Sequence, residues 1–590
     1  MTTTTVSTVV GAVNGPDGLA PDWDAIDWGS CRAEVERLRR RIFTASRDGD
    51  RARVRNLQKL MLRSRSNVLL SVRQVTQRNA GRSTAGVDGQ VALTSTTRAE
   101  LAARILSGEM KTWSPLPVRR VHIPKAGDKT KLRPLGIPVM MDRCLQAVVR
   151  NALEPEWEAQ FEARSYGFRP GRGCHDAIEA IFATLGSRSA QRLWILDADL
   201  KAAFDRIDHQ HLMSMIGSFP AAGLIWQWLK AGVIDKGSFF SSEEGTPQGG
   251  VISPCLLNIA LHGLEHAAGV RYERSGGVKR LTKRASPVVV RYADDLLALC
   301  HTRDQAEQVQ AQVAQWLRPR GLAFNDDKTS IVDAETGFDF LGFNIRRYHG
   351  KLLIKPSKTA ITRIKQRLRQ EIRASRGSTA LALIATINPI VRGWAAYYRT
   401  VVSSEIFAKL DDYLWRLTYQ WALWQHRNKP RRWVTARYFG MFNPTRNDRW
   451  VFGDRHTGVY MRRFGWTNIV RHTMVAGTAS VDDPALANYW ALRRRRPRQL
   501  PLDTYLLNQQ DRECPGCGEP LIDLDRPPQT PLEWEQWHRN VRVRTGRYPV
   551  QAVAPGRPDQ IRRTITHLRC RPQPRSGATP MHPAPPTGLA

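Results

Sequence analysis

Tyr292-Ala293-Asp294-Asp295 places two adjacent carboxylates between two apolar runs, residues 288–290 before it and 296–299 after it. Apolar runs on either side of a short polar turn are typical of a β-hairpin. Two carboxylates held side by side repel each other and lose hydration, and such pairs usually bind a divalent cation. A polar hairpin turn without a metal is the alternative, because Asp is common in turns. The tetrapeptide alone does not decide between them.

A third carboxylate favours the metal interpretation. The apolar run 193–196 leads into Asp197-Ala198-Asp199, and residues 201–209 then have the pattern of a helix start. A strand that ends here can bring Asp199 beside the acids of the hairpin. Three carboxylates can bind two Mg²⁺ ions, one activating an attacking 3′ hydroxyl and the other stabilising the leaving pyrophosphate. The pattern predicts nucleotidyl transfer by a polymerase palm.

Eight motifs in order along the chain resemble the reverse transcriptases encoded by group II introns, which also act as maturases. Two of them are SYGFRPGR at 165–172 and GTPQGGVISP at 245–254. The others lie at residues 84–89, 123–125 with 133–138 and 142–143, 199–201, 292–295, 321–329 and 340–343. A series of this length in one order is far beyond chance, so the resemblance covers most of the chain.

The charge of the chain independently predicts a polyanionic partner. It has 89 Lys and Arg against 54 Asp and Glu, a formal net charge of +35, and nucleic acid is the natural partner for such an excess. A membrane surface is the alternative, but no stretch approaches the ~20 apolar residues of a spanning helix. Most of the eight cysteines are scattered, which favours a reducing compartment. We expect a bacterial cytoplasmic protein that does not bind membranes.

Length and patterning predict a multidomain α/β chain. The expected fold is a right-hand polymerase with α+β fingers and palm, a helical thumb, a basic DNA-binding region and a small zinc-binding or HNH-like C-terminal domain. Apolar residues recur every three to four positions in 32–75 and in 351–428, which predicts helices there. The expected domains are a disordered leader at 1–30, an N-terminal helical extension at 31–110, fingers and palm at 111–345, the thumb or maturase domain X at 346–428, the DNA-binding region at 429–505, the HNH-like zinc domain at 506–571 and a disordered tail at 572–590.

The resemblance implies roles for matching positions in the polymerase site. Asp199, Asp294 and Asp295 would bind the metal ions, together with the carbonyl of Leu200. The residues expected to bind the incoming nucleotide are Lys125 and Arg133 at the triphosphate, Phe204 as the steric gate against a 2′ hydroxyl, Gln248, and Lys328 as a proton donor to pyrophosphate. An ordinary surface lysine is the alternative for Lys328. By contrast, Asp197, Asp205 and Asp208 are expected to cap helices or form salt bridges.

The segment 388–399 is similar to the family's thumb signature, and Arg392 and Arg399 within it are candidate RNA-binding residues. Trp394, Tyr397 and Tyr398 are expected in the core, because aromatic residues on a helix are usually buried. Basic clusters interleaved with aromatics follow at 431–433, 462–466 and 493–498. Such clusters suit neutralisation of a nucleic-acid backbone and stacking on bases.

The C-terminal region contains a CxxC pair followed much later by an HxxC pair. Cys514, Cys517, His567 and Cys570 would make a Cys₃His zinc set, and loosely spaced free cysteines are the alternative. The position matches the family's HNH endonuclease domain. That pattern has a His-His pair near a Glu, but Glu535-Gln536-Trp537-His538 keeps only one His. In addition, Arg571 stands where the pattern has a final His, and the expected Asn is missing near 560. We expect a degenerate nuclease domain.

These observations give the hypothesis of an RNA-directed DNA polymerase that is also an intron maturase. It would bind group II intron RNA, assist its splicing, and copy it into DNA at a primed target for intron mobility. The implied partners are the intron RNA, target DNA and dNTPs, and the implied cofactors are two Mg²⁺ ions, with Zn²⁺ as a further candidate. One alternative is a splicing maturase without polymerase activity, against which the three acids argue. Another is a defence or diversity-generating reverse transcriptase, against which the thumb signature and the nuclease remnant argue.

Overall fold

The computed structural model describes residues 22–125, 128–246, 249–275, 278–281, 286–495, 527–546 and 562–567, with 510, 513–515, 521 and 570. The predicted leader is described only from residue 22. The predicted tail at 572–590 and the predicted site residues Gln248 and Cys517 lie outside the described residues. The chain divides into two compact units: unit 1 comprises Met1–Ile354 and Thr473–Ala491, and unit 2 comprises Lys355–His472 and Leu492–Ala590.

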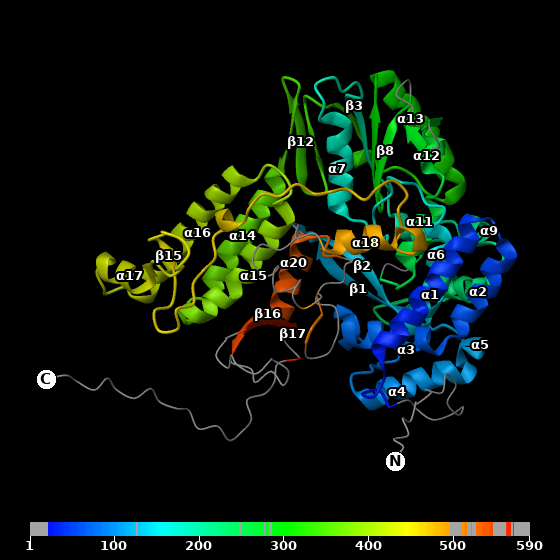
Figure 1. Cartoon of the computed structure of the whole chain (residues 1–590), viewed down its shortest axis with the longest axis horizontal. Helices are drawn as coiled ribbons and strands as arrows, with labels where there is room; N and C mark the ends of the chain where they lie inside the picture. The colour runs from blue at the N-terminus through cyan, green and yellow to red at the C-terminus, as the bar shows by residue number, and fades with distance from the viewer. Residues whose placement is uncertain are drawn as a thin grey trace, which may run out of the picture. The chain divides into compact units, whose positions relative to one another are not determined.

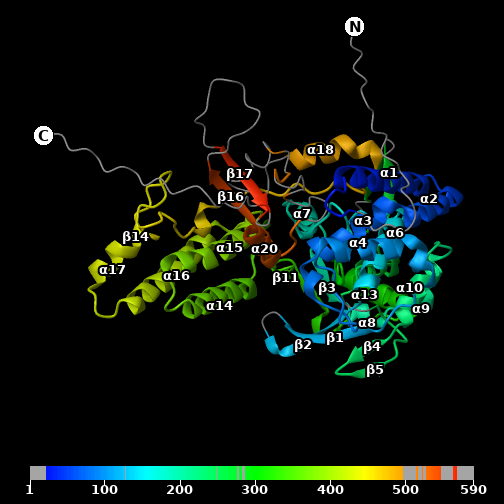
Figure 2. The ribbon, with the colours of Figure 1, turned by 90° about the horizontal axis from the view of Figure 1, so that it is seen from below.

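Unit 1 begins with three helices, α1 (Trp28–Arg47), α2 (Arg51–Arg63) and α3 (Arg65–Arg73), that pack on α6 (Met140–Glu158). Figure 2 shows them on one side of the unit. Val35, Leu38 and Ile42 of α1 are buried, which is the spacing of one helix face. The predicted helical pattern over 32–75 is therefore confirmed. Helix α6 is buried around most of its circumference, as expected for a helix at the centre of a core.

Two sheets carry the polymerase motifs. The first has the strand order β2-β1-β4-β5, and the second, the palm sheet, has the order β10-β3-β9-β8. Helices α7 (Cys174–Leu185) and α13 (Arg303–Leu317) pack against the palm sheet. The strands are β1 (Val118–Lys125), β2 (Asp128–Ile137), β3 (Trp194–Asp199), β4 (Val233–Asp235), β5 (Ser238–Phe240), β8 (Val288–Tyr292), β9 (Asp295–Cys300) and β10 (Ser330–Asp333).

The remaining helices of unit 1 precede these strands or lie between them along the chain, and α7 and α13 lie beside the palm sheet (Figure 1). They are α4 (Ser95–Arg104), α5 (Met110–Thr112), α7 (Cys174–Leu185), α8 (Ala203–Arg206), α9 (His209–Ile216), α10 (Ala222–Lys230), α11 (Ser253–Ala260), α12 (Leu264–Ala267) and α13 (Arg303–Leu317). A small hairpin is formed by β6 (Tyr272–Ser275) and β7 (Val278–Leu281).

One predicted helix is a strand. Residues 351–356, included in the helical prediction over 351–428, form β13 (Lys351–Pro356), which pairs with β12 (Phe343–Tyr348) in a sheet that also contains β11 (Phe338–Phe340). The turn between β12 and β13 has positive φ at both His349 (47°) and Gly350 (76°). Two consecutive residues with positive φ make the tight turn that joins antiparallel strands, so the chain reverses here before the helices begin.

Unit 2 is built on three long helices, α14 (Lys358–Ala374), α15 (Ala380–Tyr398) and α16 (Ser404–Gln425). Helix α20 (Pro531–Asn540) packs along α15 (Figure 1). Gly393 makes this possible, since a Cβ there would lie 2.6 Å from the backbone nitrogen of Glu535. The other elements are α17 (Arg431–Tyr438), β14 (Phe439–Gly440), β15 (Val451–Phe452), β16 (Val541–Gly546) and β17 (Arg562–His567), and α18 (Ala487–Arg495) spans the division between the units.

The segment Thr473–Ala491, here called the strap, belongs to unit 1 although it follows the thumb in sequence. Arg39 of α1 donates to both carboxylate oxygens of Asp482, at 2.8 and 2.7 Å, and to Glu154 of α6 at 3.0 Å. Arg172 donates to the carbonyls of Gly477 and Ala479. The predicted DNA-binding region at 429–505 is therefore divided between the two units. Within the described part of the chain, no helix is both long and apolar enough to cross a lipid bilayer.

Candidate active site

The acidic turn joins β8 and β9, as the sequence predicts. Tyr292 pairs with Asp295 across the hairpin, and Ala293 takes a positive φ of 58° in the turn between them. Arg291, on β8, is buried and donates to the carbonyl of Ala293 at 3.2 Å. A non-glycine residue with positive φ needs such support, because this backbone conformation is unfavourable for L-residues.

Asp199 lies at the end of β3, directly opposite Asp295 of β9. The backbone N–H of Leu200 donates to the carbonyl of Asp294 at 3.3 Å, which ties the end of β3 to the turn. Asp199, Asp294 and Asp295 therefore meet at one end of the palm sheet. The prediction that a strand end brings Asp199 beside the hairpin acids is confirmed.

Two other acids near the site, Asp208 and Asp197, have different positions in the fold. Asp208 caps α9, since its side chain accepts from the backbone N–H of His211, so the capping prediction is confirmed there. Asp197 is inside β3, not at a helix start, and the same prediction is wrong for it. Residues two apart on a strand share a face, so Asp197 lies on the face of Asp199. Burial and the charge of Asp199 raise the pKa of Asp197 to about 7.

The acids at the end of the palm sheet lie close together and are largely buried, and both conditions raise the pKa of a carboxyl group. Burial raises the pKa of Asp295 to about 7, and the charges of Asp294, Asp199 and Asp197 add to the effect. Burial also raises the pKa of Asp294. Clustered carboxylates of this kind are stabilised when a cation binds among them. Their oxygens are the ligands that hard divalent ions prefer, so the residues present fit a magnesium site.

A lysine and an amide contact the first of these acids. Lys328 ends the short helical turn Asp326–Lys328, and its Nζ lies 2.5 Å from Oδ2 of Asp199. Asn325 holds the same strand end from the backbone, its N–H donating to the carbonyl of Asp199 at 2.8 Å. The hydrogen bond to Asp199 raises the pKa of Lys328. A lysine that is 60% exposed at its side chain yet directed at the acids can reach a bound phosphate.

Phe204 is half-buried on α8, close to the acids in sequence and joined to the glycine-rich loop. The backbone N–H of Thr246 donates to the carbonyl of Phe204 at 2.5 Å. Gly249, with φ 109°, rests on β2, since a Cβ there would lie 2.5 Å from the carbonyl oxygen of Gly136. Thr246 thus lies beside α8 and Gly249 beside β2, and Gln248 lies outside the described residues.

The two predicted triphosphate-binding residues belong to the hairpin of β1 and β2. Arg133 is exposed on β2, and its positive charge partly offsets the rise that burial causes in the pKa of Asp294. Lys125 is the last residue of β1, and its side chain is not among the described parts. Arg133 is thus within electrostatic reach of the acidic cluster.

Comparison with known proteins matches three families along the chain. "N-terminal domain of reverse transcriptase" covers residues 23–105, "Reverse transcriptase (RNA-dependent DNA polymerase)" covers 123–345, and "Group II intron, maturase-specific domain" covers 361–439. The chain is 33% identical to Protein YkfC of Escherichia coli over 341 residues, 53% of this chain and 88% of YkfC. It is 31% identical to the group II intron-encoded protein LtrA of Lactococcus lactis over 290 residues, 40% of this chain and 48% of LtrA.

The chain belongs to the group II intron reverse transcriptase family. It combines an RNA-directed DNA polymerase domain with a maturase domain. A 91 kDa protein from a cob intron of Schizosaccharomyces pombe is also similar, at 27% identity over 365 residues, half of this chain and 44% of that protein.

The maturase domain of this reverse transcriptase contains α15, where the RNA-binding predictions fall. Trp394, Tyr397 and Tyr398 are buried, which confirms the expectation that they belong to the core. Arg392 is half-buried. Arg399 is only 4% exposed, and its Nε donates to the carbonyl of Asn468 at 3.1 Å. In this conformation Arg399 ties the end of α15 to the segment that contains Asn468, and its contact with RNA stays a prediction.

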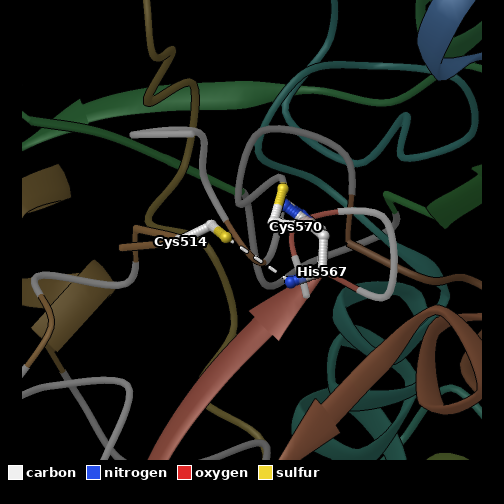
Figure 3. Close-up of side chains that lie close together, drawn as sticks. All are labelled: Cys514, His567 and Cys570. Atoms are coloured by element: carbon white, nitrogen blue, oxygen red, sulfur yellow. Dashed lines mark hydrogen bonds between the residues drawn. The ribbon is translucent and has the colours of Figure 1, made fainter. Parts of the chain in front are cut away.

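Three of the four predicted zinc ligands lie together. Figure 3 shows Cys514, His567 and Cys570, whose ligand atoms are all within 4.8 Å of one another. The backbone N–H of His567 donates to Sγ of Cys514 at 3.5 Å. Two thiols and an imidazole are the donor types that zinc prefers, so this set fits the ion; Cys517, the fourth candidate, lies outside the described residues.

In α20, the helix at the position of the predicted nuclease, Glu535 and His538 are buried. Glu535 is 3% exposed and forms ion pairs with Arg367 and Arg539. His538 is 9% exposed, and burial lowers its pKa to about 3, with Arg392 and Arg462 adding to the shift. Glu535 thus ties α20 to α14, and the ring of His538 packs on Trp534 and Trp537 of α20 itself.

Arg291 is the supporting residue that the sequence analysis missed. Besides the turn, it donates to Asn258 Oδ1 at 2.9 Å and to Ser165 Oγ at 2.6 Å, and all three side chains are buried. One signal was available: an arginine inside the apolar strand run VVVRY must find buried acceptors. Its partners could not be read from the sequence, because they lie far away along the chain.

Proposed function

We propose that this reverse transcriptase copies the group II intron RNA that its maturase domain binds, using two Mg²⁺ ions held by Asp199, Asp294, Asp295 and the Leu200 carbonyl. The observation that carries the proposal is the meeting of three carboxylates at one end of the palm sheet, where burial raises the pKa values of Asp294 and Asp295. The +35 charge of the chain supports a nucleic-acid partner of considerable size.

Different residues of the chain would bind the triphosphate, select the sugar and donate a proton. Arg133 and Lys125 would bind the triphosphate of a dNTP through charge-assisted contacts. Phe204 would close the space beside the sugar, and Gln248 would contact the nucleotide. Lys328, already directed at Asp199, would donate a proton to the leaving pyrophosphate. Bound Mg²⁺ would supply activation of the primer 3′ hydroxyl and neutralisation of phosphate charge.

The maturase role and the polymerase role make separate demands on the protein. Splicing assistance requires RNA binding, which the thumb and the basic segments would provide, with Arg392 and Arg399 as candidate contacts. DNA synthesis at a primed target would in addition require target DNA and the acidic cluster. We place this activity in the bacterial cytoplasm, where the intron RNA is transcribed.

The test uses precursor RNA containing the protein's own intron, incubated with the natural chain or with Asp294→Ala. We expect the variant to promote splicing as the natural chain does and to make no cDNA, because the substitution removes a metal ligand but no RNA contact. Splicing promoted by a natural chain that makes no cDNA would establish the maturase-only alternative. Loss of both activities in a folded variant would contradict the separation of the two sites.

The zinc prediction becomes a proposal for unit 2: Cys514, Cys517, His567 and Cys570 bind a structural zinc ion that ties the start of the C-terminal segment to β17. The proximity of three donors supports it. With the nuclease-position residues Glu535 and His538 buried, we propose that this region has a structural role and does not cleave DNA.

Zinc content gives the corresponding prediction. We expect about one zinc per chain by elemental analysis after purification without added metal, and loss of that zinc in Cys570→Ser. Cys300→Ser, a buried cysteine of β9 outside the cluster, is the control and should keep the ion. Absence of zinc from the natural chain, or its retention in Cys570→Ser, would contradict the site.

A further inference from the structure

The loop Ser165–Arg172 between α6 and α7 backs the acidic turn directly. Ser165 bridges to Arg291, and the backbone N–H of Tyr166 donates to the Arg291 carbonyl at 2.9 Å. Gly167 lies against the turn so closely that a Cβ there would be 2.2 Å from the nitrogen of Ala293. The backbone of this loop is therefore fixed relative to Asp294 and Asp295.

The residues on both sides of Phe168 are anchored. Gly167 is held on the turn, and Arg169, 2% exposed, forms a two-pronged ion pair with Glu158 in which both distances are 2.9 Å. Between these fixed points Phe168 has φ 61° and an exposed fraction of 44%. A bulky residue at positive φ is an outlier, and an exposed phenylalanine gains little from burial. Backbone strain of this kind persists mainly at functional sites.

The ring of Phe168 contacts Phe204. Their centroids are 6.1 Å apart and their planes are inclined by 68°, which is the edge-to-face geometry that aromatic pairs favour. The backbone of Phe204 is held by Thr246. The half-buried ring of Phe204 therefore contacts the ring of Phe168, which belongs to the loop that the acidic turn fixes in place. The position of the Phe204 ring is thereby linked to the position of the acids.

We propose that Phe168 is a specificity-determining positioning residue, which fixes the ring of Phe204 so that it excludes the 2′ hydroxyl of a ribonucleotide. The inference rests on the proposed role of Phe204 as the steric gate. It accounts for a strained, exposed aromatic residue at this point of the loop: the strain is retained because the ring must reach Phe204. Phe168 acts through Phe204 and does not itself touch the reacting atoms.

The experiment compares Phe168→Asn with the natural chain. Asn tolerates positive φ better than other non-glycine residues, so the loop keeps its backbone while the ring is removed, and we expect an unfolding midpoint at least as high as that of the natural chain. Single-turnover incorporation of dCTP and CTP opposite G in a primed RNA template gives the discrimination ratio, kcat/KM for dCTP over that for CTP. We expect this ratio to fall by about three- to tenfold, the scale of one edge-to-face aromatic contact.

Three further variants make the outcomes separable. Phe168→Tyr keeps the ring and should keep the ratio, and Phe239→Ala, an exposed phenylalanine on β5, controls for loss of an aromatic surface residue. Phe204→Ala should lower the ratio strongly, and adding Phe168→Asn to it should lower the ratio no further. An unchanged ratio in Phe204→Ala would show that the gate assignment itself is wrong.

Two outcomes would overturn the inference while leaving the gate intact. The first is a normal ratio in Phe168→Asn when Phe204→Ala loses discrimination. The second is an equal fall in the discrimination ratio when Phe168→Asn is introduced into the natural chain and into Phe204→Ala. That result would mean that Phe168 does not act through Phe204. If Phe168→Asn is too unstable to assay, Phe168→Leu provides the same comparison with an apolar side chain that lacks the ring.

Discussion

At the scale of single residues, the buried Arg291 connects three parts of the palm through Ser165, Asn258 and the Ala293 carbonyl. Removing the guanidinium would leave three buried acceptors without their donor, and each unsatisfied group costs roughly 1–3 kcal/mol. We predict that Arg291→Met lowers the free energy of unfolding by a few kcal/mol and abolishes DNA synthesis. Denaturant unfolding and primer extension would measure the two effects.

Arg318→Met, on an exposed arginine, is the matched control and should leave stability and activity near those of the natural chain. Arg291→Lys should not restore function, because a lysine cannot reproduce the planar set of donors. A free energy of unfolding of Arg291→Met equal to that of the natural chain would show that the acidic turn does not depend on this side chain.

His538 gives a residue-scale prediction about pH. Its pKa is lowered to about 3 by burial and by Arg392 and Arg462, whereas an unfolded histidine titrates near 6.5. Between pH 3 and pH 6.5 the unfolded state therefore binds more protons at His538 than the folded state does. The free energy of unfolding is highest, as far as this group is concerned, above about pH 6.5, and it decreases as pH falls towards 3. The slope from this group is at most about 1.4 kcal/mol per pH unit.

Hydrogen exchange of α20 at pH 7.5 and pH 5 measures this dependence. Because intrinsic amide exchange itself slows as pH falls, the quantity compared is the protection factor, the intrinsic rate divided by the observed rate. We expect lower protection factors at the lower pH in the natural chain and a smaller pH effect in His538→Leu. His456→Leu, at an exposed histidine of unit 2, should behave as the natural chain does. An equal pH effect in all three proteins would rule out His538 as its source.

At the scale of elements, hairpins and strand ends were the features best predicted from sequence. The acidic turn and the end of β3 carry local signals, apolar runs that stop at polar residues, and both were placed correctly. Residues 351–356 were included in the predicted helical stretch 351–428, although the helical spacing lies further along, at Ile361, Ile364 and Leu368. The turn at His349 and Gly350 reverses the chain, so that residues 351–356 form a strand. A positive φ at a histidine has no clear signal in the sequence, so this turn could not be predicted.

The strap could not be predicted, because its partners are more than a hundred residues away in the chain. Its ion pair is buried: the side chains of Arg39 and Asp482 are 12% and 6% exposed. A buried charge that loses its only partner typically costs about 3–5 kcal/mol. Arg39 would keep Glu154 as a partner, so the cost of losing the Asp482 charge should lie below that range. We predict that Asp482→Asn lowers the unfolding free energy of unit 1 and speeds hydrogen exchange over 473–491.

The neighbouring Asp483 supplies the control. It pairs with Arg47, whose side chain is 44% exposed, and partly exposed pairs contribute about 1 kcal/mol or less. Asp483→Asn should therefore change exchange and stability little. Equal effects of the two substitutions would mean that the Arg39 ion pair does not hold the strap.

At the scale of the whole molecule, the sequence predicted the polymerase and maturase identities because both are carried by motifs spread over most of the chain. It did not reveal the support behind those motifs: the strap, the contact of Gly167 with the acidic turn, and the packing of α20 on α15. These depend on contacts between distant segments. The charge of +35 belongs to this scale as well, and a single substitution in the acidic cluster changes it by only one unit, so RNA binding should survive the loss of catalysis.

The most direct measurement is Mg²⁺-dependent dNTP incorporation on a primed RNA template by the natural chain, Asp294→Asn and Asp304→Asn, with template binding measured in parallel. Asp304 is an exposed acid at the start of α13. We predict incorporation by the natural chain and by Asp304→Asn, none by Asp294→Asn, and equal template binding by all three. Incorporation that persists in Asp294→Asn, or is absent from a natural chain that binds the template, would contradict the assignment of the polymerase site to these acids.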